Sequence, residues 1–242
     1  MKKILEICCS SLDGCLQAEK NGGRRIELCG SMSSGGLTPS LGLYELVKEY
    51  CSIPIAVMIR PRGTGFCYSE KEFETMKRDA VIFLEKGADA IVFGFLTPDK
   101  KVDENKIKYF CDLAHSYGKE AAFHKAIDET SDLVEEIGKL YDLGVDRVLT
   151  SGGQGLAQDN IPILKQLVDL YGKKMQILVG GGIRSNNVRY IMNETKAVQI
   201  HSACRVMKQD PSIEKASILT YENAYDSVNG AEVLRMSKEM ND

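Results

Sequence analysis

Eight short apolar runs alternate along the chain with segments that have the periodicity of helices. The runs follow one another at intervals of roughly 20 to 35 residues and begin near Ile4, Arg25, Pro54, Ala90, Glu120, Asp146, Met175 and Ala197. Strict alternation of strand and helix predicts parallel strands in a protein of the α/β class. Eight such units favour a closed (β/α)8 barrel of the TIM type over a doubly wound sheet, whose common orders use five or six strands.

The chain of 242 residues shows no linker or shift in composition, so we expect a single domain over residues 1–242. The barrel is expected to occupy residues 1 to about 210, followed by a C-terminal helical extension over about 211–242. After Pro211 the sequence predicts no further strand. It predicts helices over Ser217 to Ala224 and Ala231 to Met240, packed on the barrel or against another subunit.

The composition predicts a soluble protein of the cytoplasm. A net charge of −3 without a long basic run argues against nucleic acid or an anionic membrane as a partner. No apolar stretch reaches the roughly 20 residues of a transmembrane helix, and Glu6 interrupts the first apolar run before it reaches the length of a signal peptide. The eight cysteines include no Cys-x-x-Cys pair, so we expect reduced thiols.

A Glu-x-Cys motif occurs in both of the first two predicted strands, as Glu6-Ile7-Cys8 and Glu27-Leu28-Cys29. Side chains alternate across a strand, so the acid and the thiol of each motif share one face. Parallel neighbouring strands lie about 4.8 Å apart. If these strands are neighbours, two sulfurs and two acids meet in one small volume.

Two sulfurs at that distance suit a soft cation such as Cu(I), with Cys8 and Cys29 as ligands. Zinc requires four ligands, which Glu6, Glu27 or His201 can complete, although no spacing specifies that set. The alternative is that both cysteines are buried packing residues, the usual role of a free thiol.

A second interpretation is an enzyme that acts on a small anionic or phosphorylated substrate, because polar residues gather at the carboxyl ends of the predicted strands. Arg60 and Arg62 can bind an anion, and the candidate glycine turns resemble phosphate-binding loops. The turns and the residue that follows the last strand are Ser151, Gly152, Gly153, Gly181, Gly182 and His201. Candidates for general acid and base are Glu6, Glu27, His124 and Asp128. The sequence does not decide whether the chain is an enzyme.

Several motifs in one order extend over residues 1 to about 204 and resemble the CutC copper homeostasis family. They are Leu5-Glu6-Ile7-Cys8, Arg25-Ile26-Glu27-Leu28-Cys29, Gly35-Gly36-Leu37-Thr38-Pro39-Ser40, Ile59-Arg60-Pro61-Arg62-Gly63, Phe66-Cys67-Tyr68-Ser69, Phe123-His124-Lys125-Ala126, Arg147-Val148-Leu149-Thr150-Ser151-Gly152, Gly180-Gly181-Gly182-Ile183 and His201-Ser202. The chain departs from the family pattern at Thr64-Gly65, where Gly-Asp is common, and at Ile127, where Phe is common.

The resemblance implies a cytoplasmic TIM-type barrel that forms a homo-oligomer, a dimer or a tetramer, and has a role in copper homeostasis. In some members it implies Cu(I) binding through cysteines that match Cys8 and Cys29. The partner expected for this chain is therefore a copper ion or, under the enzyme interpretation, a small anionic ligand.

Overall fold

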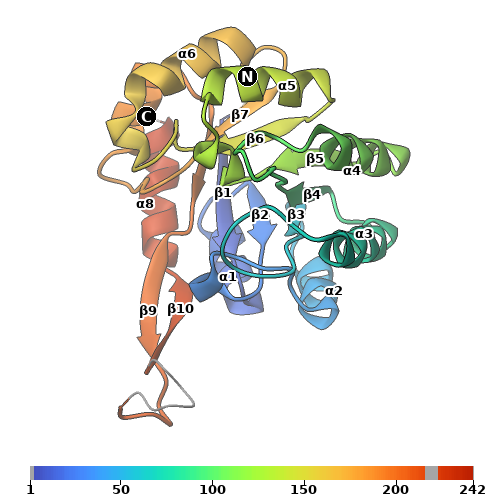
Figure 1. Cartoon of the computed structure of the whole chain (residues 1–242). Helices are drawn as coiled ribbons and strands as arrows, with labels where there is room; N and C mark the ends of the chain where they lie inside the picture. Colours follow the sequence, from blue (N-terminus) through green and yellow to red (C-terminus); the bar gives the residue numbers. More distant parts are fainter. Residues whose placement is uncertain (1–2, 216–222, 242) are drawn as a thin grey trace.

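A closed barrel of eight parallel strands in sequence order forms the centre of the computed structural model, which describes residues 3–215 and 223–241 (Figure 1). The strands are β1 (Ile4–Cys9), β2 (Arg25–Leu28), β3 (Ile55–Met58), β4 (Ala90–Phe93), β5 (Glu120–Phe123), β6 (Arg147–Thr150), β7 (Gln176–Val179) and β8 (Gln199–Ser202). Strand β8 pairs with β1 and closes the sheet. The predicted (β/α)8 barrel is therefore confirmed.

A layer of helices surrounds the barrel. The helices are α1 (Leu12–Lys20), α2 (Leu41–Tyr50), α3 (Glu70–Glu85), α4 (Glu104–Ser116), α5 (Leu133–Asp142), α6 (Ile161–Tyr171) and α7 (Val188–Thr195), with short 3-10 turns η1 (Met32–Ser34), η2 (Lys125–Glu129) and η3 (Ala157–Asp159). Serine side chains cap several N-termini, and at α3 Ser69 and Glu72 form a reciprocal capping box. No helix within residues 3–215 and 223–241 combines the length and apolar composition needed to cross a bilayer.

The strands divide their side chains between two cores. On β1, Leu5, Ile7 and Cys9 are buried between the barrel and its helices, in the large outer core. Cys8 points the other way, into an inner cluster whose other buried members are Cys29, Ala56, Met58, Ala90, Val92 and Ala122. The alternation expected for the first strand is therefore present, and it directs Glu6 and Cys8 inward.

The C-terminal region differs from the prediction. Strand β9 (Arg205–Gln209) pairs antiparallel with β10 (Ala224–Val228), so the expectation of no strand after Pro211 is wrong. The helix predicted over Ser217 to Ala224 lies largely outside the described residues, and its last residue belongs to β10. Residues Ala224–Val228 form a strand because β9 supplies their hydrogen-bonding partner, and the hydrophobic periodicity of five residues cannot reveal such a partner.

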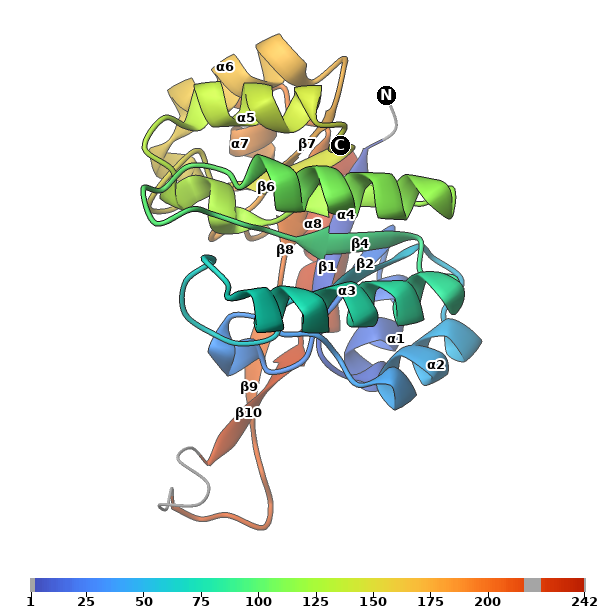
Figure 2. The same ribbon diagram turned by 45° about the vertical axis from the view of Figure 1, so that its right-hand side comes forward.

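The hairpin of β9 and β10 extends away from the barrel (Figures 1 and 2). Its base is anchored where Val228 packs on α1, against Gly14. The chain then ends in α8 (Gly230–Asn241), which packs beside α1 and α7 and confirms the helix predicted over Ala231 to Met240.

Candidate metal centre

Cys8 and Cys29 lie side by side inside the barrel. Cys8 is on β1, and Cys29 directly follows β2, the parallel neighbour of β1. Their Sγ atoms are 3.7 Å apart, and the Cys8 thiol donates to the Cys29 sulfur. Both side chains are buried and neither forms a disulfide. The two Glu-x-Cys motifs therefore bring their sulfurs together as their spacing predicts.

Burial and a neighbouring carboxylate keep both thiols protonated. The Cys29 thiol donates to Glu27 Oε2 at 3.6 Å. The hydrogen bond to Cys29, burial and the charge of Glu27 raise the pKa of Cys8 well above its ordinary value. The hydrogen bond from Cys8 lowers the pKa of Cys29, but burial and Glu27 outweigh this effect and raise it to about 11. A metal ion that binds both sulfurs must displace their protons, and Glu27 is placed to accept one.

His201, on β8, connects the two acids of the repeated motif. Its Nδ1 lies 2.8 Å from Glu6 Oε1, and its Nε2 lies 3.8 Å from Glu27 Oε2. Burial lowers the pKa of His201, but Glu27, the hydrogen bond with Cys8 and Glu6 raise it well above its ordinary value. Ligand atoms of Cys8, Glu27 and His201 all lie within 4.8 Å of one another. Because an imidazolium has no free lone pair, His201 in this charged form cannot act as a metal ligand.

A polar network that the sequence analysis did not identify forms a floor beneath the sulfurs. Arg25 forms an ion pair with Glu6 and donates to Gln199 Oε1 at 2.8 Å. Burial raises the pKa of Glu6, but Arg25, the hydrogen bond with His201 and Arg147 outweigh it and hold this pKa well below its usual range. Further hydrogen bonds complete the network and join Gln199, Gln176, Glu120 and Arg147.

Arg60, a candidate anion ligand, binds the backbone of the loop between β2 and α2. Its Nη1 donates to the carbonyl oxygens of residues 34–36 at 3.0 to 3.1 Å, and its Nη2 donates to the Thr64 carbonyl at 2.6 Å. The same loop covers a sulfur: a Cβ added at Gly36, whose φ is +83°, would lie 3.2 Å from Cys29 Sγ. Arg60 therefore positions the loop that closes over Cys29.

The turn Ser151-Gly152-Gly153 holds a carboxylate of the protein itself. The backbone N–H groups of Ser151 and Gly153 donate to Asp128 at 2.9 and 3.1 Å, and the Ser151 hydroxyl donates to it at 2.8 Å. The N–H of Gly152 donates to the hydroxyl of Thr150. Asp128 thus engages the donors that would otherwise bind an external anion.

The other candidate anion ligands differ in the contacts that they make. At Gly181 and Gly182 the described hydrogen bonds involve the carbonyl groups, which accept from the N–H of Ala157 and from Asn187, and not the N–H groups that would bind an anion. At the mouth, Arg62 forms an ion pair with Glu72 at 2.5 Å. The guanidinium of Arg62 is therefore paired within the protein.

His124 is buried at the end of β5, next to Phe66, and ring centroids of the two are 5.0 Å apart. Its Nδ1 accepts a hydrogen bond from the N–H of Ala126. Burial and the charge of Arg60 lower the pKa of His124 to about 3, so its ring is neutral. In the described hydrogen bonds and ion pairs, His201 and not His124 contacts Glu6 and Glu27.

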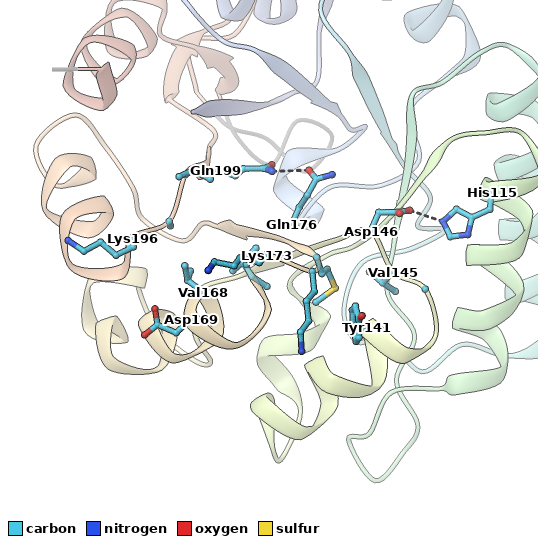
Figure 3. A pocket seen from close by; sticks show the side chains of 17 residues that line it. His115, Tyr141, Val145, Asp146, Val168, Asp169, Lys173, Gln176, Lys196 and Gln199 are labelled. Carbon is cyan, nitrogen blue, oxygen red and sulfur yellow. Dashed lines mark hydrogen bonds and ion pairs between the residues drawn. The ribbon is translucent and has the colours of Figure 1, made fainter. Parts of the chain in front are cut away.

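A cavity of about 730 Å³ opens at the opposite end of the barrel, before β6, β7 and β8 (Figure 3). His115 and Asp146 line it and lie 2.8 Å apart, and Gln176 and Gln199 border it from the floor network. The floor network therefore stands between this cavity and the sulfurs at the carboxyl end.

Comparisons with known proteins identify the family. A sequence model described as the CutC family matches residues 3–206. A CutC family protein of Treponema denticola is 38% identical, over 98% of each chain. The copper homeostasis protein cutC homolog of Mus musculus is 38% identical over 84% of this chain and 74% of its own.

Solved structures agree with this assignment. The CutC protein of Streptococcus agalactiae superposes with a TM-score of 0.78 at 33% identity, covering 83% of this chain and 98% of its own. Phosphoribosyl anthranilate isomerase from Thermococcus kodakaraensis, at 15% identity and a TM-score of 0.60 over 99% of each chain, shares the barrel fold alone. By its sequence and its fold, the chain belongs to the CutC family.

Proposed function

We propose that this protein binds Cu(I) through Cys8 and Cys29 and acts in copper homeostasis. The observation that carries the proposal is the 3.7 Å separation of the two Sγ atoms inside the barrel. Soft thiolate ligands favour Cu(I) over hard cations. The name of the mouse relative, a copper homeostasis protein, points to the same metal.

The surroundings support Cu(I) over zinc. A four-ligand zinc site here requires His201 or a carboxylate in addition to the sulfurs. The pKa of His201 is raised well above its ordinary value and its ring pairs with Glu6 and Glu27, so the cysteine sulfurs are better placed than His201 to bind a soft cation. Glu27, which already accepts a hydrogen bond from Cys29, can take the proton that Cu(I) displaces from Cys29, and the proton displaced from Cys8 leaves to the solvent.

An anaerobic Cu(I) titration of the reduced protein tests the proposal directly. Competition with a chromophoric Cu(I) chelator is expected to show one tightly held copper per chain in the natural protein. Cys8→Ser combined with Cys29→Ser is expected to abolish retention. Cys67→Ser is the control, because Cys67 is an exposed free thiol away from the pair. Equal copper retention by the natural protein and the double variant contradicts the proposal.

The geometry favours metal binding over the enzyme alternative. An anionic substrate would need the N–H groups of Ser151 and Gly153, which donate to Asp128, and the guanidinium of Arg62, which pairs with Glu72. We therefore favour the copper function over the enzyme alternative.

We place this function in the cytoplasm, where reduced thiols persist, as the many free cysteines suggest. We also propose that the protein is a homo-oligomer, as the family resemblance implies. Light scattering of the purified protein measures the subunit number, and a monomer at micromolar concentration contradicts this part of the proposal.

A further inference from the structure

We propose that Met32 is a third sulfur ligand of Cu(I) and the residue through which the ion reaches Cys8. This inference rests on the proposed function, because it extends the same site. It assigns a thioether to a site that the two cysteines alone would leave with two donors.

The sulfur of Met32 touches Cys8 as closely as the second cysteine does. Met32 Sδ lies 3.6 Å from Cys8 Sγ, and Cys29 Sγ lies 3.7 Å from the same atom. Met32 is partly buried and packs against the inner cluster that contains both cysteines. Cys8 is therefore flanked by two sulfurs, and thioether and thiolate are both ligand types that select Cu(I).

The loop that carries Met32 is fixed by several independent contacts. Paired backbone hydrogen bonds between Gly30 and Leu37 close it. Arg60 binds the three consecutive carbonyls of residues 34–36. Ser31 adopts a left-handed conformation with φ of 41°, which costs free energy in a residue other than glycine. These contacts hold the thioether over Cys8 before any metal arrives.

Met32 also stands between Cys8 and the solvent. It lines a small cavity of about 10 Å³ together with Cys8. It lines as well an outer cavity of about 770 Å³ between its own loop and the hairpin of β9 and β10, which includes Asp226 and Tyr225. Met32 lines this outer cavity whereas Cys8 and Cys29 do not, so an ion that enters from it reaches the sulfur of Met32 before those of the cysteines. A thioether carries no proton, so it can take Cu(I) before the cysteines are deprotonated.

The test compares Met32→Leu with the natural protein. Exchange of Met for Leu conserves volume and usually costs under about 1.5 kcal/mol, so the variant is expected to fold, which circular dichroism checks. Cu(I) affinity, measured by anaerobic chelator competition, is expected to fall by about tenfold or more, since even the loss of an outer-shell partner costs about 10 to 100-fold. X-ray absorption is expected to show three sulfur neighbours of copper in the natural protein and two in the variant.

Met236→Leu is the matched control. Met236 is buried with its sulfur 3.4 Å from Cys204 Sγ, a similar contact outside the proposed site. Its replacement is expected to leave both affinity and sulfur count unchanged.

The outcomes separate this inference from the proposed function. If the double serine variant of Cys8 and Cys29 retains copper, the proposed function fails, and the assignment of Met32 fails with it. If that variant loses copper but Met32→Leu keeps either the natural affinity or three sulfur neighbours, only the assignment of Met32 is overturned.

Discussion

His201 Nδ1 lies 2.8 Å from Glu6 Oε1, and this contact joins the eighth strand of the barrel to the first. The same carboxylate forms an ion pair with Arg25 on the second strand. Glu6 thus links three consecutive strands at the seam where the barrel closes. Because all three side chains are largely buried, the free energy of folding depends on each charge keeping its partner.

Glu6→Gln is expected to lower the free energy of unfolding by about 3 to 5 kcal/mol, because it leaves buried cations without their shared carboxylate. Urea denaturation followed by circular dichroism measures this change. Glu45→Gln is the control: Glu45 pairs with Lys86 at 2.6 Å, but both side chains are about half exposed. Such a pair contributes only about 0 to 1 kcal/mol. A similar small loss in both variants contradicts the structural role of Glu6.

His124 is expected to make the fold weaken in acid. Its pKa is about 3 in the folded protein, against an ordinary value of 6.5. The contribution of neutral His124 to the free energy of unfolding is therefore complete above pH 6.5. It is lost as the pH falls toward 3, because the unfolded chain binds the proton at a higher pH than the folded protein does. Between about pH 6 and 4 this loss approaches about 1.4 kcal/mol per pH unit. Urea denaturation across this range is expected to give a flatter slope for His124→Asn, and the same slope in both proteins contradicts the assignment.

Gly94→Ala is expected to destabilise the protein, because the added Cβ would lie 2.3 Å from His124 Cε1. Overpacking of this kind costs about 1 to 3 kcal/mol. Gly42→Ala is the matched control, since Gly42 lies in α2 with no heavy atom within 4 Å of an added Cβ. It is expected to stabilise the protein by about 0.5 to 1 kcal/mol. Thermal denaturation distinguishes the two, and a shift in the same direction for both contradicts the packing of His124 on Gly94.

Asp128→Ala is expected to create an anion site. It frees N–H groups of Ser151 and Gly153 together with the Thr150 hydroxyl, at a cost of about 3 kcal/mol or more. Inorganic phosphate is then expected to raise the melting temperature of the variant in proportion to its occupancy, while the natural protein does not respond. Equal shifts in both proteins would mean that phosphate binds elsewhere or that the natural turn is already open.

The strands and the inward cysteines could be predicted because both depend on local patterns. Hydrophobic runs and side-chain alternation place Cys8 and Cys29 on the inner face, and parallel neighbours follow from strict alternation of strand and helix. Strand β10 could not be predicted in this way, since its five residues gain their hydrogen bonds from β9, more than a dozen positions away in the sequence. His201 was identified only as a residue at the end of its strand, without its partners.

The floor network and Met32 escaped the sequence analysis for different reasons. Each floor residue outside β1 stands at the first position of its strand, as Arg25 and Gln199 do, so the alternation that directs Glu6 and Cys8 inward contained this information. The sequence analysis considered polar residues at the carboxyl ends of the strands and not those at the first positions. Met32 lies in a loop, where no periodicity applies, and its place over Cys8 depends on Arg60, which follows it by 28 positions in the chain.

The floor network lies directly beneath the sulfurs of Cys8 and Cys29. Hydrogen bonds join arginine, glutamate and glutamine side chains across the barrel beneath Glu6, between the sulfurs and the far cavity. Under the proposed function, a metal ion therefore enters and leaves by the same opening at the carboxyl end. Loading and unloading then share one route and cannot occur at the same time.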